Sequence, residues 1–196
     1  TGGISSRNLS VAAYGSDYIE IVITVFMFLF GVNFTLYYTA FKGGLKYALH
    51  DEELRVYFFT VVGAAALIAI NVYSQVYGSV GESVQHAAFQ VSSLITTTGF
   101  ATADFNLWPV FSQLILLLLM FVGASAGSTG GGIKVVRVVV LFKVIKRELT
   151  RVIHPRAVRT IKLNGRLVDE EVVSGVMAFF YFYILIFVAA VLTVAL

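Results

Sequence analysis

Cysteine is absent from the 196 residues, and charged side chains are scarce. Without a thiol, the chain can form neither disulfide bonds nor thiolate metal sites. Only 13% of the sequence is charged and 58% is hydrophobic, whereas a typical soluble domain carries roughly 25% charged residues. This composition argues against a soluble domain and favours a protein embedded in a lipid bilayer.

Four long stretches are almost free of charge. Residues 19–41 contain Glu20 as their single charge, and residues 56–76, 108–133 and 172–196 contain none. Each stretch reaches the roughly 18–20 apolar residues that cross a bilayer core of about 30 Å. Buried helices of a large soluble protein are the alternative, but four such stretches do not fit one small core. The sequence therefore predicts an all-α polytopic membrane protein.

Basic residues are distributed unevenly between the connections. Residues 77–104 contain no lysine or arginine, and Arg7 is the one basic residue of the first sixteen. Two connections are basic, the first through Lys42, Lys46 and Arg55, the second through Lys143, Lys146, Arg147, Arg151, Arg156, Arg159, Lys162 and Arg166. The positive-inside rule predicts a multi-pass protein of the cell (inner or plasma) membrane, with residues 42–55 and 143–171 cytoplasmic and residues 1–16 and 77–107 facing outward. Nucleic-acid binding by the second basic stretch is the alternative, and its place between two membrane spans argues against it.

An internal repeat organises the chain. The segment Thr1–Ser5 resembles Thr97–Ala101, and each copy is followed by a polar stretch, a long apolar run and basic residues. Acidic triplets at 51–53 and 169–171 each open a further apolar run. Both copies cross the membrane in the same direction, unlike the inverted repeats of many secondary transporters. The sequence predicts helix–pore-loop–helix units.

The predicted units divide the chain into four parts. Residues 1–50 form the end of one unit, with a filter loop and its second helix. Residues 51–146 form a complete unit, consisting of a helix at 56–76, a pore helix at 81–94, a filter at 95–100 and a broken helix at 108–146. Residues 147–171 form a cytoplasmic basic linker, and residues 172–196 form the first helix of the next unit.

The segment 81–94 is too short to cross the membrane, because fourteen helical residues span roughly 21 Å. It leads directly into the Thr/Gly loop 95–100. A helix entering from outside directs its negative end toward the membrane middle, which favours a cation there. Backbone carbonyls of the loop can then replace the water around the ion. The predicted ion-binding residues are Thr1, Gly2, Gly3, Thr96, Thr97, Thr98 and Gly99. An ordinary Thr/Gly turn outside the membrane is the alternative, and the second copy of the motif argues against it.

A continuous helix over 108–146 would be roughly 58 Å long, nearly twice the hydrocarbon thickness. Five glycines within ten residues interrupt it, and each glycine costs a helix about 1 kcal/mol relative to alanine. We interpret the interruption as a flexible gate in the ion path, with close helix packing through small residues as the alternative. The gating residues are Gly123, Ala124, Ser125, Ala126, Gly127, Ser128, Thr129, Gly130, Gly131 and Gly132.

Within this segment, Gly123–Gly127 matches the G-x-S-x-G nucleophile motif of serine hydrolases by letter. That motif requires a preceding strand and His and Asp partners, and no histidine lies near it in the sequence. An intramembrane serine hydrolase using Ser125 therefore stays a weak alternative, and we expect no enzyme. His86 in the pore helix is expected to be a packed, hydrogen-bonded side chain.

Three motifs resemble one known family, namely ITTTGF at 95–100, GSTGGGIK at 127–134, and RELTRVIHP at 147–155 followed by IKLNG at 161–165. Together they are similar to the Trk/Ktr/HKT superfamily of potassium transporters, and the last motif points to its TrkH/TrkG branch. The resemblance implies four helix–pore-loop–helix units around a pseudo-fourfold axis, with one filter glycine from each. The chain is then expected to be an internal fragment covering parts of units two to four.

By this resemblance, Gly3 and Gly99 are the filter glycines of units two and three, and K⁺ binds at the filter carbonyls. Residues 123–132 correspond to the gating loop of unit three. No cofactor is expected, K⁺ being the transported ion. The implied partners are a second copy of the protein and a cytoplasmic nucleotide-binding TrkA-like subunit. A carrier that couples K⁺ to H⁺ or Na⁺ is the alternative to a channel.

Overall fold

The computed structural model of the chain describes residues 5, 7, 9–154 and 160–195. The chain forms two compact units, residues 1–136 and residues 137–196. The predicted filter residues Thr1, Gly2 and Gly3 lie outside the described residues.

The secondary structure of the first unit is helical, and α7 begins at the end of this unit. In chain order they are η1 (Ser10–Tyr14), α1 (Asp17–Phe30), α2 (Phe34–Thr39), η2 (Ala40–Gly44), α3 (Leu45–Leu49), α4 (Glu52–Val72), η3 (Tyr73–Tyr77), α5 (Val80–Ile95), η4 (Phe105–Leu107) and α6 (Val110–Phe121). Helix α7 (Val135–Ile153) begins at the end of this unit, and β1 (Lys162–Leu163), β2 (Arg166–Leu167) and α8 (Glu170–Ala195) follow in the second unit.

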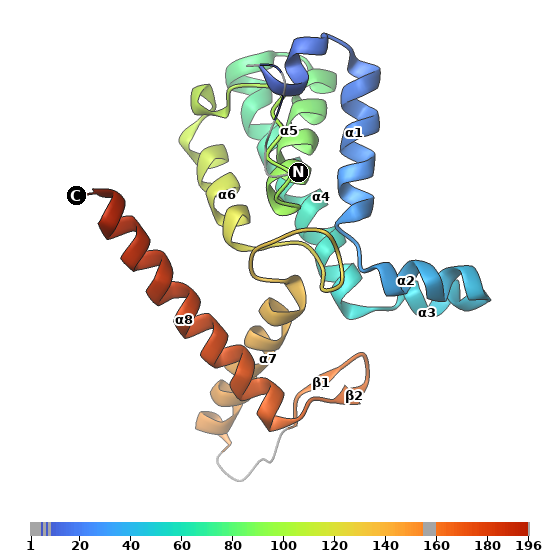
Figure 1. Cartoon of the computed structure of the whole chain (residues 1–196), viewed down its shortest axis with the longest axis vertical. Helices are drawn as coiled ribbons and strands as arrows, with labels where there is room; N and C mark the ends of the chain where they lie inside the picture. Colours follow the sequence, from blue (N-terminus) through green and yellow to red (C-terminus); the bar gives the residue numbers. More distant parts are fainter. Residues whose placement is uncertain (1–4, 6, 8, 155–159, 196) are drawn as a thin grey trace. The chain divides into compact units, whose positions relative to one another are not determined.

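The short helix α5 is the centre of the first unit. It packs against α1, α4 and α6, as Figure 1 shows. Ala87, Phe89, Val91 and Ile95 of α5 are completely buried. Three neighbouring helices thus surround a helix of 16 residues.

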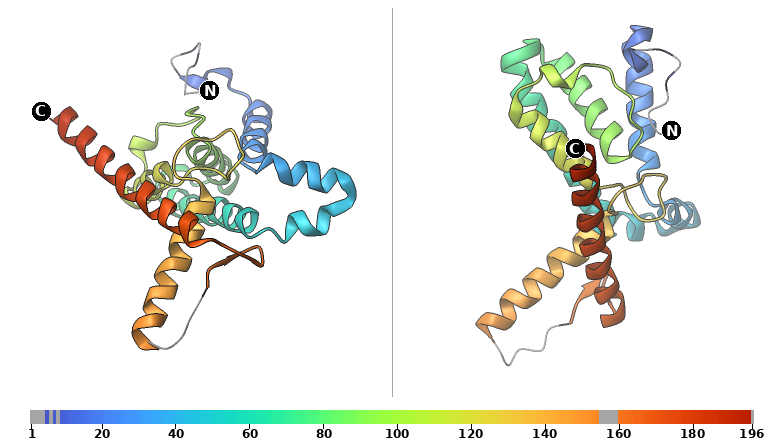
Figure 2. Two further views of the ribbon diagram at one scale, coloured as in Figure 1. Left: turned by 60° about the horizontal axis from the view of Figure 1, so that its bottom comes forward. Right: turned by 60° about the vertical axis from the view of Figure 1, so that its left-hand side comes forward.

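The first apolar run forms two helices, α1 and α2, instead of the single straight helix that its composition suggests. The two axes meet at an angle of 88°. Asn33 begins α2, because its side-chain Oδ1 accepts the backbone N–H of Thr35 at 2.9 Å. This N-cap favours a new helix start over continuation of the old one. From the bend onward, α2 and α3 lie side by side and project from the α1, α4, α5 and α6 group, as Figure 2 shows.

Two helical segments in the described part are long and apolar enough to cross a membrane, Glu52–Tyr77 and Glu170–Ala195. The bent pair Asp17–Phe30 and Phe34–Leu49 would be a third if it counts as one span. Helix α6 has only 12 residues and ends where the predicted break begins. These helices agree with a multi-pass membrane protein.

In the second unit, a small hairpin interrupts the helices. Strands β1 and β2 pair antiparallel, and Asn164 and Gly165 between them have φ angles of 50° and 77°. Asn-Gly is the favoured pair for such a two-residue turn, a signal that the all-α prediction passed over. Val140 of α7 and Val173 of α8 meet in an apolar cluster with Ile161, so the unit has its own small core.

Candidate functional site

The Thr/Gly loop continues directly from the end of α5. The amides of Thr98 and Gly99 donate to the carbonyl oxygen of Ser93 at 2.8 and 3.4 Å. In a trans peptide unit the N–H and the preceding C=O point in opposite directions. The carbonyl groups of Thr97 and Thr98 therefore point away from Ser93.

Backbone conformation in this loop is unusual. Gly99 has a φ of 77° and Thr97 a φ of 54°. Glycine adopts such angles without steric cost, whereas a β-branched residue there is a genuine outlier. Strained residues of this kind persist only where the surrounding structure holds them, and they gather at functional sites.

Side chains of α5 hold the chain as it leaves the loop. Ser93 Oγ donates to the carbonyl oxygen of Phe100 at 2.6 Å, and Gln90 Nε2 donates to the carbonyl oxygen of Ala103 at 3.0 Å. Both Ser93 and Gln90 are buried. The entry and the exit of the loop are thus fixed to the same helix.

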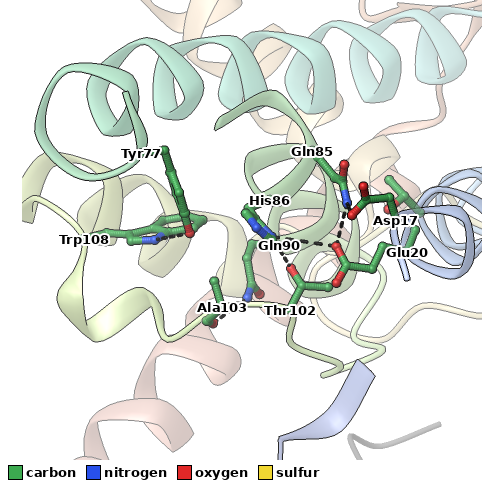
Figure 3. Close-up of polar contacts among 10 residues, drawn as sticks. Asp17, Glu20, Tyr77, Gln85, His86, Gln90, Thr102, Ala103 and Trp108 are labelled. Carbon is green, nitrogen blue, oxygen red and sulfur yellow. Dashed lines mark hydrogen bonds and ion pairs between the residues drawn. The ribbon is translucent and has the colours of Figure 1, made fainter. Parts of the chain in front are cut away.

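A polar network at the other end of α5 joins this helix to α1 (Figure 3). Gln85 Nε2 donates to Glu20 Oε2 at 2.8 Å and lies 3.2 Å from Asp17 Oδ1. His86 Nδ1 lies 3.0 Å from Thr102 Oγ1 and 3.8 Å from Glu20 Oε2. Glu20 is only 6% exposed, so Gln85 gives a buried carboxylate the donor that it needs.

His86 is a packed, hydrogen-bonded residue, and its ring stacks on Tyr77 at a centroid distance of 5.1 Å. Sequence reasoning did not identify Glu20 as part of a site. The sequence feature that could have identified Glu20 is its position as the single charge within the apolar run 19–41.

The glycine-rich segment lies between α6 and α7 and closes back on itself. The Gly123 amide donates to the Ile133 carbonyl oxygen at 2.8 Å, and the Ile133 amide donates to the Phe121 carbonyl oxygen at 3.3 Å. A Cβ on Gly123 would collide with the carbonyl group of Gly131. Glycine at position 123 therefore permits the two ends of the segment to meet.

The same segment touches the Thr/Gly loop. The Gly131 amide donates to Thr97 Oγ1 at 2.8 Å. A Cβ on Gly130 would lie 3.4 Å from the Thr96 carbonyl oxygen and 2.8 Å from the Ala124 side chain. The two segments that the sequence singled out, 96–99 and 123–132, are thus in direct contact.

The bend between α1 and α2 forms hydrogen bonds with the glycine-rich segment. The Ser125 amide donates to the Gly31 carbonyl oxygen at 3.0 Å, and the Phe34 amide donates to the Gly127 carbonyl oxygen at 3.2 Å. Carbonyl groups at a helix C-terminus have no partner within the helix, and the bend makes them available to the segment. A helix that continued without a bend would leave these carbonyl groups within its own hydrogen bonds.

A cavity of about 420 Å³ opens beside both segments. Apolar side chains of α1 line one side, and the polar lining comes from the loop and from the glycine-rich segment. The threonines that line it are Thr96, Thr97, Thr98 and Thr129. Hydroxyl and carbonyl oxygens suit a hard, dehydrated cation, whereas no group of three or more His, Cys, Asp or Glu side chains among the described residues could hold a metal ion.

Ser125 does not have the surroundings of a catalytic serine. It is 1% exposed, and no described hydrogen bond joins its hydroxyl to a histidine. His86 bonds Thr102 instead, and His50 bonds the Lys46 carbonyl oxygen. The match to the nucleophile motif is one of letters alone.

Comparisons with known proteins all point to the same family. The family model TrkH, described as cation transport protein, matches residues 1–196. Potassium uptake protein TrkH of Escherichia coli K12 is 38% identical over 98% of this chain, and TrkH of Vibrio parahaemolyticus is 40% identical over 97%. Potassium uptake protein TrkG of E. coli K12 is 34% identical over 94% of the chain.

The chain spans about 40% of the length of the two TrkH relatives and 38% of TrkG. The crystal structure of the potassium transporter TrkH from V. parahaemolyticus is similar with a TM-score of 0.91 at 38% identity, over 98% of this chain and 42% of that one. This chain belongs to the TrkH family of cation transport proteins, a family of membrane transporters and not of enzymes.

Proposed function

We propose that this chain supplies one complete pore-forming unit, and parts of the two units beside it, to a protein that takes up K⁺ across the cell membrane. Residues 51–146 form the complete unit, and residues 96–99 contribute its share of the selectivity filter. The relatives are named as potassium uptake proteins, and their similarity to this chain extends over 98% and 94% of its length.

One observation carries the proposal, the contact between the Thr/Gly loop and the glycine-rich segment. The conformation of the loop supports a carbonyl-lined ion site, because its amides turn back to α5 and its carbonyl groups point away from the Ser93 oxygen. The C-terminal end of α5 adds a partial negative charge at the same place. The segment 123–132 lies against this loop through Gly131 and Thr97, where it would obstruct an ion.

The segment 123–132 then acts as the gate of the unit. It contains no regular helix, and its hydrogen bonds with the α1–α2 bend join uncharged groups. Such bonds contribute only about 0.5–1.5 kcal/mol each, so the segment can leave its position at a moderate cost in free energy. In this proposal, flux requires that displacement.

The proposed orientation places residues 42–55 and 143–171 in the cytoplasm. Lys42 and Lys46 lie on the projecting α2–α3 hairpin, and the Asn164–Gly165 turn lies in the second basic connection. Labelling of single cysteines from each side of the membrane would test this orientation.

Light scattering of the full-length protein tests the proposed homodimer, and co-purification tests the nucleotide-binding TrkA-like partner.

The test of the filter is Gly99→Ser in the full-length protein. Gly99 has a φ of 77°, so a side chain there should shift the neighbouring carbonyl groups and lower the permeability of K⁺ relative to Na⁺. The matched control is Gly165→Ser, since Gly165 also has a φ of 77° and no atom within 4 Å of its Cβ position. The control should keep the parent selectivity.

The assay is the reversal potential of the protein in planar bilayers at varied K⁺ and Na⁺. Unchanged selectivity in Gly99→Ser would refute the filter assignment. The same recordings separate a channel from a coupled carrier. A channel follows the K⁺ gradient, whereas a reversal potential that also moves with pH or with Na⁺ would identify coupling.

A further inference from the structure

Glu53 is a buried acidic residue in the first turn of α4 and makes two contacts with the glycine-rich region. Its side chain is only 6% exposed. Glu53 Oε1 accepts the amide N–H of Ala126 at 2.6 Å and that of Val136 at 3.1 Å. Ala126 lies within the segment 123–132, and Val136 lies in the first turn of α7. One oxygen atom therefore joins the segment to the helix that follows it.

These two hydrogen bonds should be stronger than ordinary ones, because their acceptor is a carboxylate. A buried carboxylate is costly unless donors surround it, and hydrogen bonds to a charged group are roughly twice as strong as neutral ones. Helix α7 has no acidic residue in its own first turn, although a helix N-terminus favours a negative charge. Glu53 supplies that charge from α4.

The geometry also makes the two contacts dependent on each other. Both amides donate to the same atom, Oε1, so a movement of the first turn of α7 that carries Oε1 with Val136 also weakens the bond to Ala126. Lys134 Nζ donates to the Gly130 carbonyl oxygen, and the bonds of the segment to Gly31, Phe34 and Thr97 join uncharged groups. Glu53 thus lies where a displacement of α7 can be passed to the segment.

We propose that Glu53 is a positioning residue, which holds the 123–132 segment against the Thr/Gly loop and couples its release to the start of α7. This proposal rests on the proposed function, since it concerns the gate of the same ion path. In this proposal, Glu53 sets how often the segment leaves its position, and the filter sets which ion passes.

The experiment uses the full-length protein in liposomes and measures K⁺ flux under resting conditions. Glu53→Gln removes the charge, and Glu53→Asp keeps the charge but shortens the side chain so that one oxygen cannot reach both amides. We expect resting flux to rise by roughly tenfold in each variant, because Glu53→Gln weakens both charge-assisted hydrogen bonds to neutral ones and Glu53→Asp loses one of the two. Glu52→Gln removes the same charge one residue away on the same helix turn and should leave flux at the parent level.

A second readout does not depend on conduction. Ser125→Cys places a thiol at a position that is 1% exposed, in a segment of chain that has no other cysteine. A water-soluble thiol reagent can modify it only after the segment has moved, and mass spectrometry locates the modified residue. Labelling should be roughly tenfold faster with Glu53→Gln than with Glu52→Gln.

Two results would overturn the proposal. One is resting flux and Ser125→Cys labelling in both Glu53 variants that equal those of the parent. The other is an equal change in Glu52→Gln, which would show a general effect of charge. The Gly99→Ser measurement tells the two proposals apart. If Gly99→Ser lowers selectivity and the Glu53 variants leave resting flux and labelling unchanged, the filter assignment is supported and the Glu53 contact has no role in gating.

Discussion

Gly31 is a position at which one added methyl group should destabilise the protein strongly. It lies at the end of α1, and a Cβ there would collide with the hydroxyl of Tyr57 and lie 2.8 Å from its Cζ and 2.9 Å from Thr96 Cγ2. Gly31 itself has an ordinary helical conformation, with φ −76° and ψ −13°. Alanine is therefore acceptable to the backbone, and the whole cost comes from packing.

That cost follows from the neighbours. Tyr57 is completely buried, and its hydroxyl donates to the Phe28 carbonyl oxygen at 3.0 Å. Overpacking a tight core costs about 1–3 kcal/mol, and a lost hydrogen bond adds about 1 kcal/mol. Gly31→Ala should therefore lower the free energy of unfolding by about 2–4 kcal/mol. Because Thr96 is pushed as well, the selectivity for K⁺ over Na⁺ should also fall.

The assay is unfolding of the purified full-length protein in detergent, arranged as a double-mutant cycle. Tyr57→Phe alone should cost about 1 kcal/mol. Added to Gly31→Ala, it removes the nearest clashing atom, so the double variant should be about 1 kcal/mol more stable than the sum of the single effects. Gly63→Ala is the control, because no atom lies within 4 Å of its Cβ position and alanine favours the helix by about 1 kcal/mol. A Gly31→Ala protein as stable as the parent, or effects that add without coupling, would refute this account of the bend.

Two further substitutions test hydrogen bonds at the two ends of α5. Ser93→Ala removes the hydrogen bond to the Phe100 carbonyl oxygen, worth about 1 kcal/mol, and should lower K⁺ over Na⁺ selectivity roughly fivefold in bilayer recordings; full selectivity would show that this bond does not shape the filter. Gln85→Leu leaves the Glu20 carboxylate without its donor at 2.8 Å and should lower the unfolding free energy by about 1–3 kcal/mol. Adding Glu20→Gln should restore part of that loss, and a double variant less stable than Gln85→Leu would contradict the network.

Local signals in the sequence were sufficient for several elements. The acidic triplet at 51–53 and the charge-free run after it indicated the helix that the structure forms as α4 (Glu52–Val72). The run of polar and apolar residues at 81–94 indicated a short helix, and α5 covers Val80–Ile95. Five glycines in ten residues indicated the interruption between α6 and α7. In each case the deciding property, hydropathy or helix propensity, belongs to the residues themselves.

Other features depended on partners that are far away in the sequence. The bend at Gly31 follows a run whose composition alone suits one straight span, and its carbonyl group finds a donor in Ser125. Glu53 looked like one acid of a triplet, and nothing local indicated that it would meet Ala126, 73 residues later. A hydrogen bond between distant residues has no period or composition that a sequence pattern could show.

By itself, the sequence predicted a membrane protein, most of its helices, and irregular backbone at residues 96–99 and 123–132. Those properties follow from side-chain hydropathy and from the conformational freedom of glycine, which act locally. Only the tertiary structure decided that these two segments touch, through Gly131 and Thr97, and that Glu20 and Glu53 are buried beside donors. Burial and hydrogen-bond partnership arise when helices pack, because packing brings together groups that the chain itself keeps apart.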